Sequence, residues 1–169
     1  MKVTLKKIVY SEALSQETNA FTADVYIDGK LVGYARNNGC GGSTFVMAHD
    51  RILLEAAESY FAALPPKPYT HGDRTFELPI SLDGMVDEAL EDYLNQKHIK
   101  KMEKDMVKGI IHGGKYGYTL ISWANLTLQQ MLDSPTGKVK VINEIQKLNV
   151  SGKTILNTNI PKEILVAVL

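Results

Sequence analysis

The segment FTADVYIDGKLVGYARN, residues 21–37, constrains the fold more than any other part of the sequence. Apolar residues alternate with other residues from Phe21 to Ile27, and Asp28-Gly29 follows at once. Alternation at period two followed by Asp-Gly is a strong signal for a β-hairpin, because the two central residues of a type I′ turn need positive φ. The sequence therefore predicts two antiparallel strands joined at Asp28-Gly29.

Counting outward from this turn predicts how the two strands pair. The predicted pairs are Ile27–Lys30, Val25–Val32, Ala23–Tyr34, Asp24–Gly33 and Thr22–Ala35. One face of the hairpin is then apolar and aromatic. The other face is shallow, so we expect it to accept a close neighbour.

The rest of the chain alternates between helical and strand-like patterns. The expected elements are a first strand over 2–10, a helix over 50–64 begun by Asp50, one short strand over 75–78, a long helix from Leu82 to Val107, a second hairpin around Gly113-Gly114, two short helices within 127–148, and strands over 153–159 and 164–169. This grouping predicts an α+β fold with an antiparallel or mixed sheet. We expect one globular domain over 1–169, in which the N-terminal β-hairpin packs against several helices, including the long one.

Charge and cysteine content narrow the class of protein. Lys and Arg total 19 and Asp and Glu also total 19, whereas a protein that neutralises phosphates normally carries a basic surplus. We therefore expect no nucleic-acid partner.

Cys40 is the only cysteine, so a disulfide framework and a thiolate metal cage are excluded, and we expect no metal and no cofactor. The segment MKVTLKKIVYSEALSQ has no unbroken apolar run, so we expect no secretory signal, no membrane span and a cytoplasmic location.

The glycine-rich segment YARNNGCGGSTF, residues 34–45, is the best candidate ligand site. Glycine permits the close approach and positive φ that converging backbone N–H groups need around a phosphate. The segment lacks both the Lys-Ser/Thr pair of a P-loop and the spacing G-x-G-x-x-G. Its alternative role is a turn, which Asn and Gly commonly form. The candidate ligand-binding residues here are Arg36, Asn37, Asn38, Gly39, Gly41, Gly42, Ser43 and Thr44.

A second glycine-rich segment, IHGGKYGY, runs from residue 111 to residue 118. Three residues of this segment are candidates for binding a nucleotide: His112 through proton transfer, Lys115 through its charge and Tyr116 through stacking on the base. The alternative is that Gly113-Gly114 is an ordinary hairpin turn flanked by tyrosines that favour strands. His71, two residues before Asp73, is a weaker candidate for general base work.

Two segments carry a resemblance to a known group of proteins. ADVYIDGKLVGYARNNGCGGST, residues 23–44, resembles the N-terminal part of uncharacterised small accessory proteins of bacteriophages and mobile elements, and ILNTNI, residues 155–160, is similar to their closing motif. The resemblance transfers no activity to named residues. It implies that the protein is a non-enzymatic binder that blocks a host defence or redirects a host protein, and that it acts in the host cytoplasm.

The sequence thus favours a non-enzymatic binding protein of phage-accessory type that sequesters a nucleotide-like ligand or a host defence protein. A metal-independent phosphodiesterase, or a related nucleotide-degrading enzyme, using His112 or His71 is the second hypothesis. A protein–protein interaction module that uses the charged long helix and the shallow hairpin face is the third. The apolar run Ile164–Leu169 either completes the sheet or pairs across a homo-oligomer.

Overall fold

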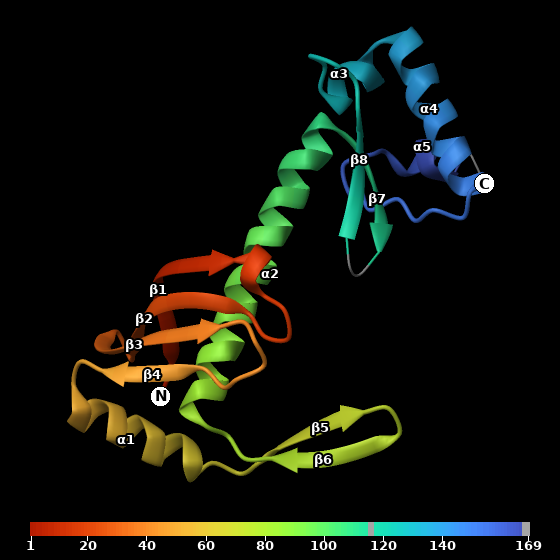
Figure 1. Cartoon of the computed structure of the whole chain (residues 1–169). Coiled ribbons are helices and arrows are strands. Elements are labelled where there is room, and N and C mark those ends of the chain that lie inside the picture. The colour runs from red at the N-terminus through yellow and green to blue at the C-terminus, as the bar shows by residue number, and fades with distance from the viewer. Residues whose placement is uncertain (115–116, 167–169) are drawn as a thin grey trace. The chain divides into compact units, whose positions relative to one another are not determined.

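The computed structural model describes residues 1–114 and 117–166, except for the side chain of His71. The fold is α+β, as the sequence predicts, with an N-terminal antiparallel sheet and one long helix (Figure 1). In chain order the elements are β1 (Val3–Ser11), a 3-10 helix (Glu12–Leu14), β2 (Ala20–Ile27), β3 (Lys30–Asn38), β4 (Phe45–Ala48), α1 (Arg51–Ala62), β5 (Lys67–His71), β6 (Arg74–Leu78), α2 (Leu82–Lys108), β7 (Gly109–Gly114), β8 (Gly117–Ser122), α3 (Leu128–Asp133), α4 (Pro135–Val150) and α5 (Lys162–Val166).

The chain divides into two compact units, Met1–Leu94 and Asn95–Leu169, each with its own hydrophobic core. The division falls inside α2, so each unit contains part of that helix. We call them unit 1 and unit 2 and describe each by itself. The expectation of one domain over 1–169 stays a prediction.

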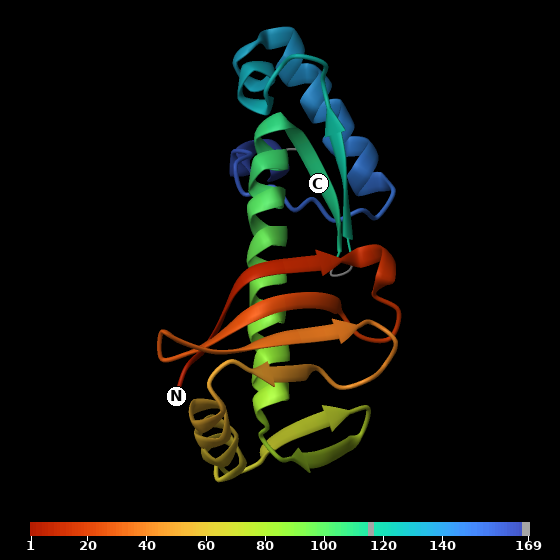
Figure 2. The same ribbon diagram turned by 60° about the vertical axis from the view of Figure 1, so that its left-hand side comes forward.

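Unit 1 is built on a four-stranded antiparallel sheet in the order β1-β2-β3-β4. Alternate side chains of β2 are buried, which is the pattern of a strand with one face on a core. Helix α1 and the first part of α2 cover that face, and Figure 2 shows the strands in front of α2. The buried side chains include Phe21, Val25, Phe61, Val86 and Leu90. The opposite side of the sheet, which we call the outer face, carries the remaining alternate residues.

The β2–β3 hairpin turns where predicted, but its pairing is shifted. Asp28 has φ of 47° and Gly29 has φ of 83°, as a type I′ turn requires. Beyond Ile27 and Lys30 the predicted pairs are wrong, because Val32 is an extra residue between two successive pairs and forms a β-bulge. The observed pairs include Tyr26–Leu31, Val25–Gly33, Asp24–Tyr34, Ala23–Ala35 and Thr22–Arg36.

The bulge changes which residues share a face of the sheet. Ala35 lies on the core side and is fully buried, whereas Tyr34 and Arg36 lie on the outer face opposite Asp24 and Thr22. The prediction of a shallow face lined by Gly33 and Ala35 is therefore wrong. The outer face instead carries large aromatic and cationic side chains.

Helix α1 begins and ends at the residues that the sequence indicates. The Asp50 carboxylate accepts a hydrogen bond of 3.0 Å from the Leu53 backbone N–H, which is the N-cap interaction. The helix ends just before Pro65-Pro66. The segment that follows forms a complete two-stranded hairpin, β5–β6, rather than the single short strand expected, and Gly72, the first residue of its turn, has φ of 59°.

Unit 2 contains the second predicted hairpin, β7–β8, which is paired from Gly109–Ser122 to Gly114–Gly117. Gly113 and Gly114 are themselves paired, with Tyr118 and Gly117, so the hairpin does not turn at these two glycines, and residues 115–116 lie outside the described part of the chain. Helices α3 and α4 were both predicted, and Val141, Ile145 and Leu148 of α4 are buried in the unit 2 core.

The C-terminal strands are the main error of the sequence-based assignment. Within 153–159 the only pairing in the described chain is an isolated bridge between Ile155 and His112. Lys162–Val166 forms the short helix α5, in which the Ile164 backbone N–H donates to the Pro161 carbonyl. Ile164 is buried, so part of the apolar run is covered as a helix and not as a strand. Proline suits the start of a helix because its missing N–H has no partner there.

Candidate functional site

The glycine loop, residues 37–44, is held by the side chain of Asn37. The Asn37 Oδ1 atom accepts hydrogen bonds from the Gly39 backbone N–H at 2.8 Å and from Thr18 Oγ1 at 3.0 Å. The Asn37 amide donates to the Gly42 carbonyl at 2.9 Å and to Thr44 Oγ1 at 3.2 Å. Both polar atoms of this side chain are therefore used, within the loop and by Thr18, which is how an asparagine that shapes a turn behaves.

The backbone of the loop is tied to the segment before β2. The Gly39 carbonyl accepts hydrogen bonds from the backbone N–H groups of residues 16, 17 and 18. Gly39 and Gly41 have φ of 85° and 89°, the left-handed conformation that glycine adopts without strain. Cys40 is exposed at the tip, where its thiol lies 3.7 Å from the Asn38 carbonyl. The loop is thus a well-bonded corner between β3 and β4.

Thr44 anchors the end of the loop to α2. Its hydroxyl donates a hydrogen bond of 2.5 Å to Asp87 Oδ1, and its side chain is buried. Burial raises the pKa of the Asp87 carboxyl, and the nearby Asp83 also raises it, while the Thr44 hydroxyl acts in the opposite direction. A carboxylate at this point repels a phosphate, so the Thr44 end of the loop favours no anion.

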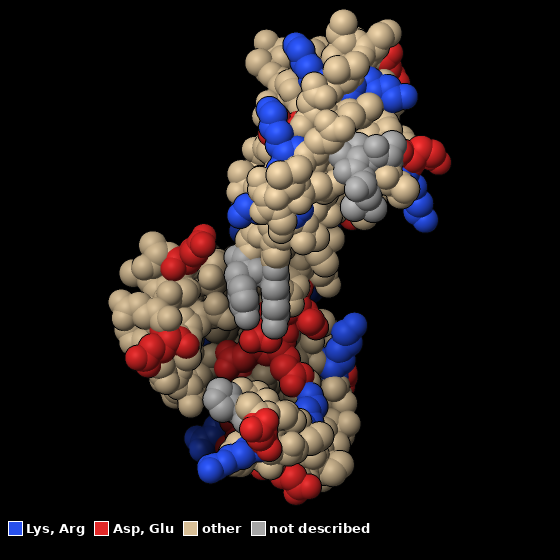
Figure 3. Space-filling model, turned by 90° about the vertical axis from the view of Figure 1, so that its right-hand side faces the viewer, with Lys and Arg blue, Asp and Glu red and all other residues tan. Residues whose placement is uncertain are grey.

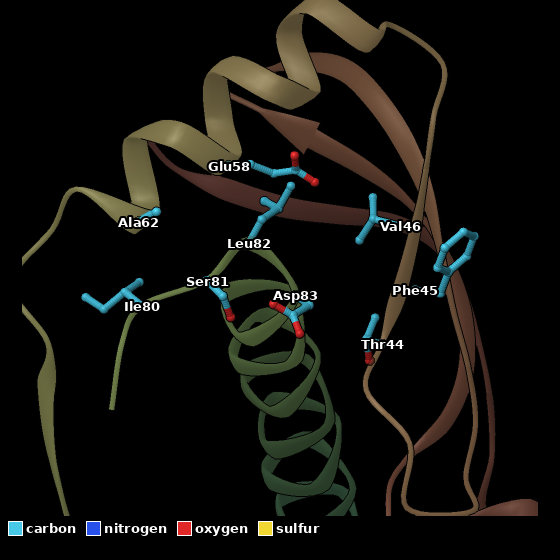
Figure 4. A pocket seen from close by; sticks show the side chains of 9 residues that line it. All are labelled: Thr44, Phe45, Val46, Glu58, Ala62, Ile80, Ser81, Leu82 and Asp83. Carbon is cyan, nitrogen blue, oxygen red and sulfur yellow. The ribbon is translucent and has the colours of Figure 1, made fainter. Parts of the chain in front are cut away.

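A pocket of about 420 Å³ lies beside this anchor (Figure 4). Its polar lining consists of the carboxyl groups of Glu58 and Asp83 and the hydroxyl groups of Thr44 and Ser81. Its apolar lining includes Val46, which points toward the pocket in Figure 4, whereas the ring of Phe45 lies on the other side of β4. Two carboxylates and no cation make this pocket unsuited to a nucleotide phosphate.

Carboxylates also gather over a larger area, as the face drawn in Figure 3 shows. The first half of α2 is acidic in sequence, with Asp83, Asp87, Glu88, Glu91 and Asp92, and the second half is rich in lysine. Lys67 of β5 pairs with Glu88 at 2.8 Å, so part of the acidic surface is neutralised within unit 1. The balanced net charge of the chain therefore hides strongly uneven local charge.

Arg36 lies on the outer face of the sheet, away from the loop atoms described above. It is exposed, and its guanidinium carbon lies 5.7 Å from the centre of the Phe45 ring. Phe45 stands opposite Arg36 in the pairing of β3 with β4, and 55% of its surface is exposed. The two form a cation–π pair at the edge of the sheet, with the ring open to solvent.

A second pair of the same kind lies on β1 and β2. Lys6 Nζ lies 4.0 Å from the centre of the Tyr26 ring. Half-buried Tyr34 stands opposite Met47 of β4, and 47% of the Met47 surface is exposed. The outer face of unit 1 thus combines the exposed Phe45 ring and the half-buried rings of Tyr26 and Tyr34 with cations.

The predicted residues of the second site lie in unit 2. His112 is half-buried in β7, where its backbone forms the bridge to Ile155. Lys115 and Tyr116 lie outside the described residues. The structure therefore places Arg36 and the glycine loop in one unit and His112 in the other. The candidate residues Asn38, Gly42 and Ser43 are all exposed, and their role in binding stays a prediction.

The motif ILNTNI has a structural explanation. Asn157 is buried, its Oδ1 accepts from the Ile111 backbone N–H at 2.7 Å, and its amide donates to the Gly109 carbonyl at 3.0 Å. Asn159 accepts from the Asn157 amide at 2.9 Å and donates to the Met106 carbonyl at 3.0 Å. The two asparagines satisfy backbone groups at the end of α2 and along β7, so the motif holds the core of unit 2 together.

A further polar cluster in unit 2 joins α2 to β8. Asp105 accepts hydrogen bonds from Lys108 Nζ at 2.7 Å and from the Tyr118 hydroxyl at 2.9 Å. These two bonds lower the pKa of the Asp105 carboxyl, Lys108 acting most strongly. Burial and Asp105 together raise the pKa of Tyr118. The cluster holds β8 against α2, and its polar atoms are occupied by these hydrogen bonds.

Within the described ranges, no group of three His, Cys, Asp or Glu side chains is arranged to hold a metal ion. None of the helices in the described part of the chain has the length and apolar character needed to cross a membrane. Comparison of the chain with protein-family models, curated protein sequences and solved structures found no match.

Sequence reasoning selected Arg36 but missed Phe45, Tyr26 and Lys6. Phe45 lies in STFVMAHD, residues 43–50, which fits either a short strand or the approach to a helix, so the face on which Phe45 lies is not predictable from the sequence. Tyr26 alternates with buried residues in the predicted strand, which does indicate an outward position. The sequence does carry one indication of this surface, because aromatic and basic residues occupy outward positions of the first two strands.

Proposed function

We propose that this chain is a binding protein for a nucleotide-like ligand, with Arg36 and Phe45 as the centre of its site. The observation that carries the proposal is the exposed Phe45 ring with the Arg36 guanidinium 5.7 Å from its centre. A nucleobase stacks on an open aromatic ring, and a guanidinium binds a phosphate through paired N–H donors. A ligand that carries both groups fits this pair better than one that carries either group alone.

The surroundings of the pair support binding at the outer face rather than inside the glycine loop. The loop uses Asn37, Gly39 and Thr44 for its own hydrogen bonds, and the neighbouring pocket is lined by carboxylates. Arg36 has no carboxylate partner among the described residues. In the context that the resemblance implies, a phage accessory protein of this kind sequesters its ligand from a host system.

Calorimetry with a panel of linear and cyclic nucleotides tests the proposal. We expect binding to the unchanged protein and at least about a tenfold loss in both Arg36→Ala and Phe45→Ala, because each removes one half of the recognition. Arg51→Ala and Phe76→Ala are matched controls, since Arg51 and Phe76 are exposed residues of the same kinds in unit 1. Absence of heat with every nucleotide, or unchanged affinity in both site variants, contradicts the proposal.

The same incubations separate binding from catalysis. We expect each nucleotide to be recovered intact by chromatography after long incubation with the protein. Turnover that His112→Ala abolishes contradicts the proposal and favours the phosphodiesterase hypothesis. Turnover that persists in His112→Ala contradicts the proposal as well, and directs attention to other residues.

A second candidate function, a protein-interaction module, is favoured by one observation on the β5–β6 hairpin. Tyr69 and Phe76 are paired across the two strands and are 52% and 46% exposed, and Leu78 on the same face is 48% exposed. Exposed apolar side chains gathered in this way are typical of protein contact surfaces. Loss of co-purification with a defined host protein in Tyr69→Ser/Phe76→Ser, with Phe45→Ala unaffected, is the result expected for this candidate.

A further inference from the structure

We propose that the ligand of the outer face is single-stranded nucleic acid, with successive bases stacked on Phe45, Tyr34 and Tyr26. This inference rests on the proposed function, because Phe45 and Arg36 belong to both. It specifies an oligonucleotide instead of a mononucleotide. We call Phe45, Tyr34 and Tyr26 the aromatic row.

The strand register arranges the aromatic row as a diagonal. Phe45 stands opposite Arg36, which is two residues from Tyr34 on β3. Tyr34 stands opposite Asp24, which is two residues from Tyr26 on β2. Each step therefore moves one strand across and two residues along the sheet, a separation of about 7–8 Å between the backbone positions. The row has regular spacing over three neighbouring strands.

The spacing sets the size of the ligand. Two diagonal steps extend over about 15 Å, which is several times the rise of about 3.4 Å along the helix axis per nucleotide of one strand in B-form DNA. A mononucleotide reaches only one ring at a time, whereas an extended single strand with unstacked bases reaches all three. A duplex keeps its bases stacked and paired, so their faces are not available to the aromatic row.

Charge along the aromatic row is complementary to a phosphate backbone. Arg36 lies at the Phe45 end and Lys6 at the Tyr26 end, each within cation–π distance of its ring. Asp24, which stands opposite Tyr34, is bound to Lys7 at 2.9 Å, so its negative charge is compensated. The zero net charge of the chain does not oppose this arrangement, because acidic residues concentrate in the first half of α2, whose apolar side chains pack on the other face of the sheet.

Fluorescence anisotropy with labelled oligothymidylates of one, three, six and twelve nucleotides tests the inference on the full chain. We expect affinity to rise steeply from one nucleotide to between three and six, and then to level off. A twelve-base-pair duplex is expected to bind at least about tenfold more weakly than the twelve-nucleotide strand. Equal affinity for one and twelve nucleotides overturns the inference but leaves the proposed function standing. Failure of every length overturns the inference. Failure of every length together with absence of binding across the nucleotide panel overturns both, and is the result expected for a face that binds protein.

Variants of the aromatic row add a second measurement. Phe45→Ala, Tyr34→Leu and Tyr26→Leu are each expected to weaken binding of the twelve-nucleotide strand at least about fivefold, since each removes one stacking face. Leucine keeps apolar volume at the two half-buried positions, and thermal melting verifies that each variant folds. Phe76→Ala is the matched control outside the aromatic row. Unchanged affinity in the three folded variants overturns the inference.

Salt dependence measures the number of phosphate contacts. With Lys6 and Arg36 as the two contacts, log K is expected to fall with log salt at a slope of about −1.4, and Arg36→Ala is expected to reduce the magnitude of that slope by about 0.7. Arg51→Ala keeps the slope of the unchanged protein. A slope near zero, or one that Arg36→Ala does not alter, overturns the assignment of phosphates to these cations.

Discussion

The Thr44 hydroxyl donates a hydrogen bond of 2.5 Å to the Asp87 carboxylate, and this bond joins the end of the glycine loop to helix α2. Thr44 also accepts a bond from the Asn37 amide, so one hydroxyl links a turn, a strand end and a helix. The arrangement accounts for much of the loop sequence without any ligand. It also leads to predictions about stability that are independent of the binding proposals.

Thr44→Val is expected to destabilise the protein by about 1–3 kcal/mol. The change keeps the shape of the side chain but removes the hydrogen bond to the half-buried Asp87 carboxylate and one of the two acceptors of the Asn37 amide, which keeps the Gly42 carbonyl. The loss of a partner for a buried polar group costs about this amount. Urea denaturation at neutral pH measures the difference. Ser43→Ala, at the exposed neighbouring position, is the control and is expected to change stability by less than about 0.5 kcal/mol. Equal stability of the two variants contradicts the anchoring role of Thr44.

Asp87 is expected to make stability depend on pH. Its folded pKa lies above the usual value of 3.8, so the folded state binds its proton more tightly than the unfolded state does. The contribution is fully present below about pH 3.8 and is lost as the pH rises through the folded pKa. Asp87→Asn removes this dependence. In Thr44→Val the pKa of Asp87 is expected to rise further, because the bond that lowers it is gone.

Carboxyl resonances followed by NMR during a pH titration measure that pKa directly. An Asp87 pKa in Thr44→Val equal to or below that of the unchanged protein contradicts the explanation. Asp105 is the internal reference in the same spectra. Its folded pKa is lowered by Lys108 and Tyr118, so its contribution is present above the usual carboxyl pKa and is lost as the pH falls through the folded value.

Gly39→Ala is expected to destabilise the protein, whereas Gly42→Ala is expected to be tolerated. An alanine Cβ at position 39 meets the Leu14 carbonyl oxygen and the Ala20 side chain, and the backbone there has φ of 85°. The left-handed conformation alone costs a residue with a Cβ about 1–2 kcal/mol. A Cβ at position 42 meets nothing within 4 Å. Thermal melting of the two variants tests the prediction, and a Gly39→Ala protein as stable as Gly42→Ala disproves it.

Asn157→Ala is expected to lower the stability of unit 2 by about 2–6 kcal/mol. It leaves the Ile111 N–H and the Gly109 carbonyl buried without partners, and each such loss costs about 1–3 kcal/mol. Hydrogen exchange of the Ile111 amide measures the effect locally, and we expect strongly faster exchange. In Asn157→Asp the rate of exchange is expected to lie between those of the unchanged protein and Asn157→Ala. The aspartate accepts a hydrogen bond from the Ile111 N–H but has no amide to donate to the Gly109 carbonyl. Unaltered protection of the Ile111 amide in Asn157→Ala refutes this role.

The sequence predicts the elements that local chemistry decides. Asp28-Gly29 and the Asp50 cap each depend on neighbours in sequence, and each is found where expected. The strand register beyond the turn depends on how β3 pairs with β2 and β4, and no local sequence pattern encodes that pairing. The bulge at Val32 is therefore invisible in the sequence, and it moves the residues that matter most for the site.

The candidate site illustrates the same division. The glycine loop was identifiable from composition, but its hydrogen bonds to Thr18 and Asp87 come from positions far away in sequence. Arg36 was selected for its charge, while its partner Phe45 belongs to a strand that forms only by pairing with β3. The C-terminal run was read as a strand because short apolar segments fit either structure, and Pro161 starts a helix there instead.

The bulge at Val32 decides which face of the sheet carries Tyr34 and Arg36. Pairing residue by residue outward from the turn would place Tyr34 opposite Ala23 and Arg36 opposite Phe21, so both side chains would point into the core and Ala35 would point outward. Deleting Val32 leaves the pairs from Val25–Gly33 onward unchanged, because it removes only the extra residue. A mutation that keeps the chain length but restores uninterrupted pairing therefore removes the outer face as a binding surface, even where every aromatic and cationic residue is kept.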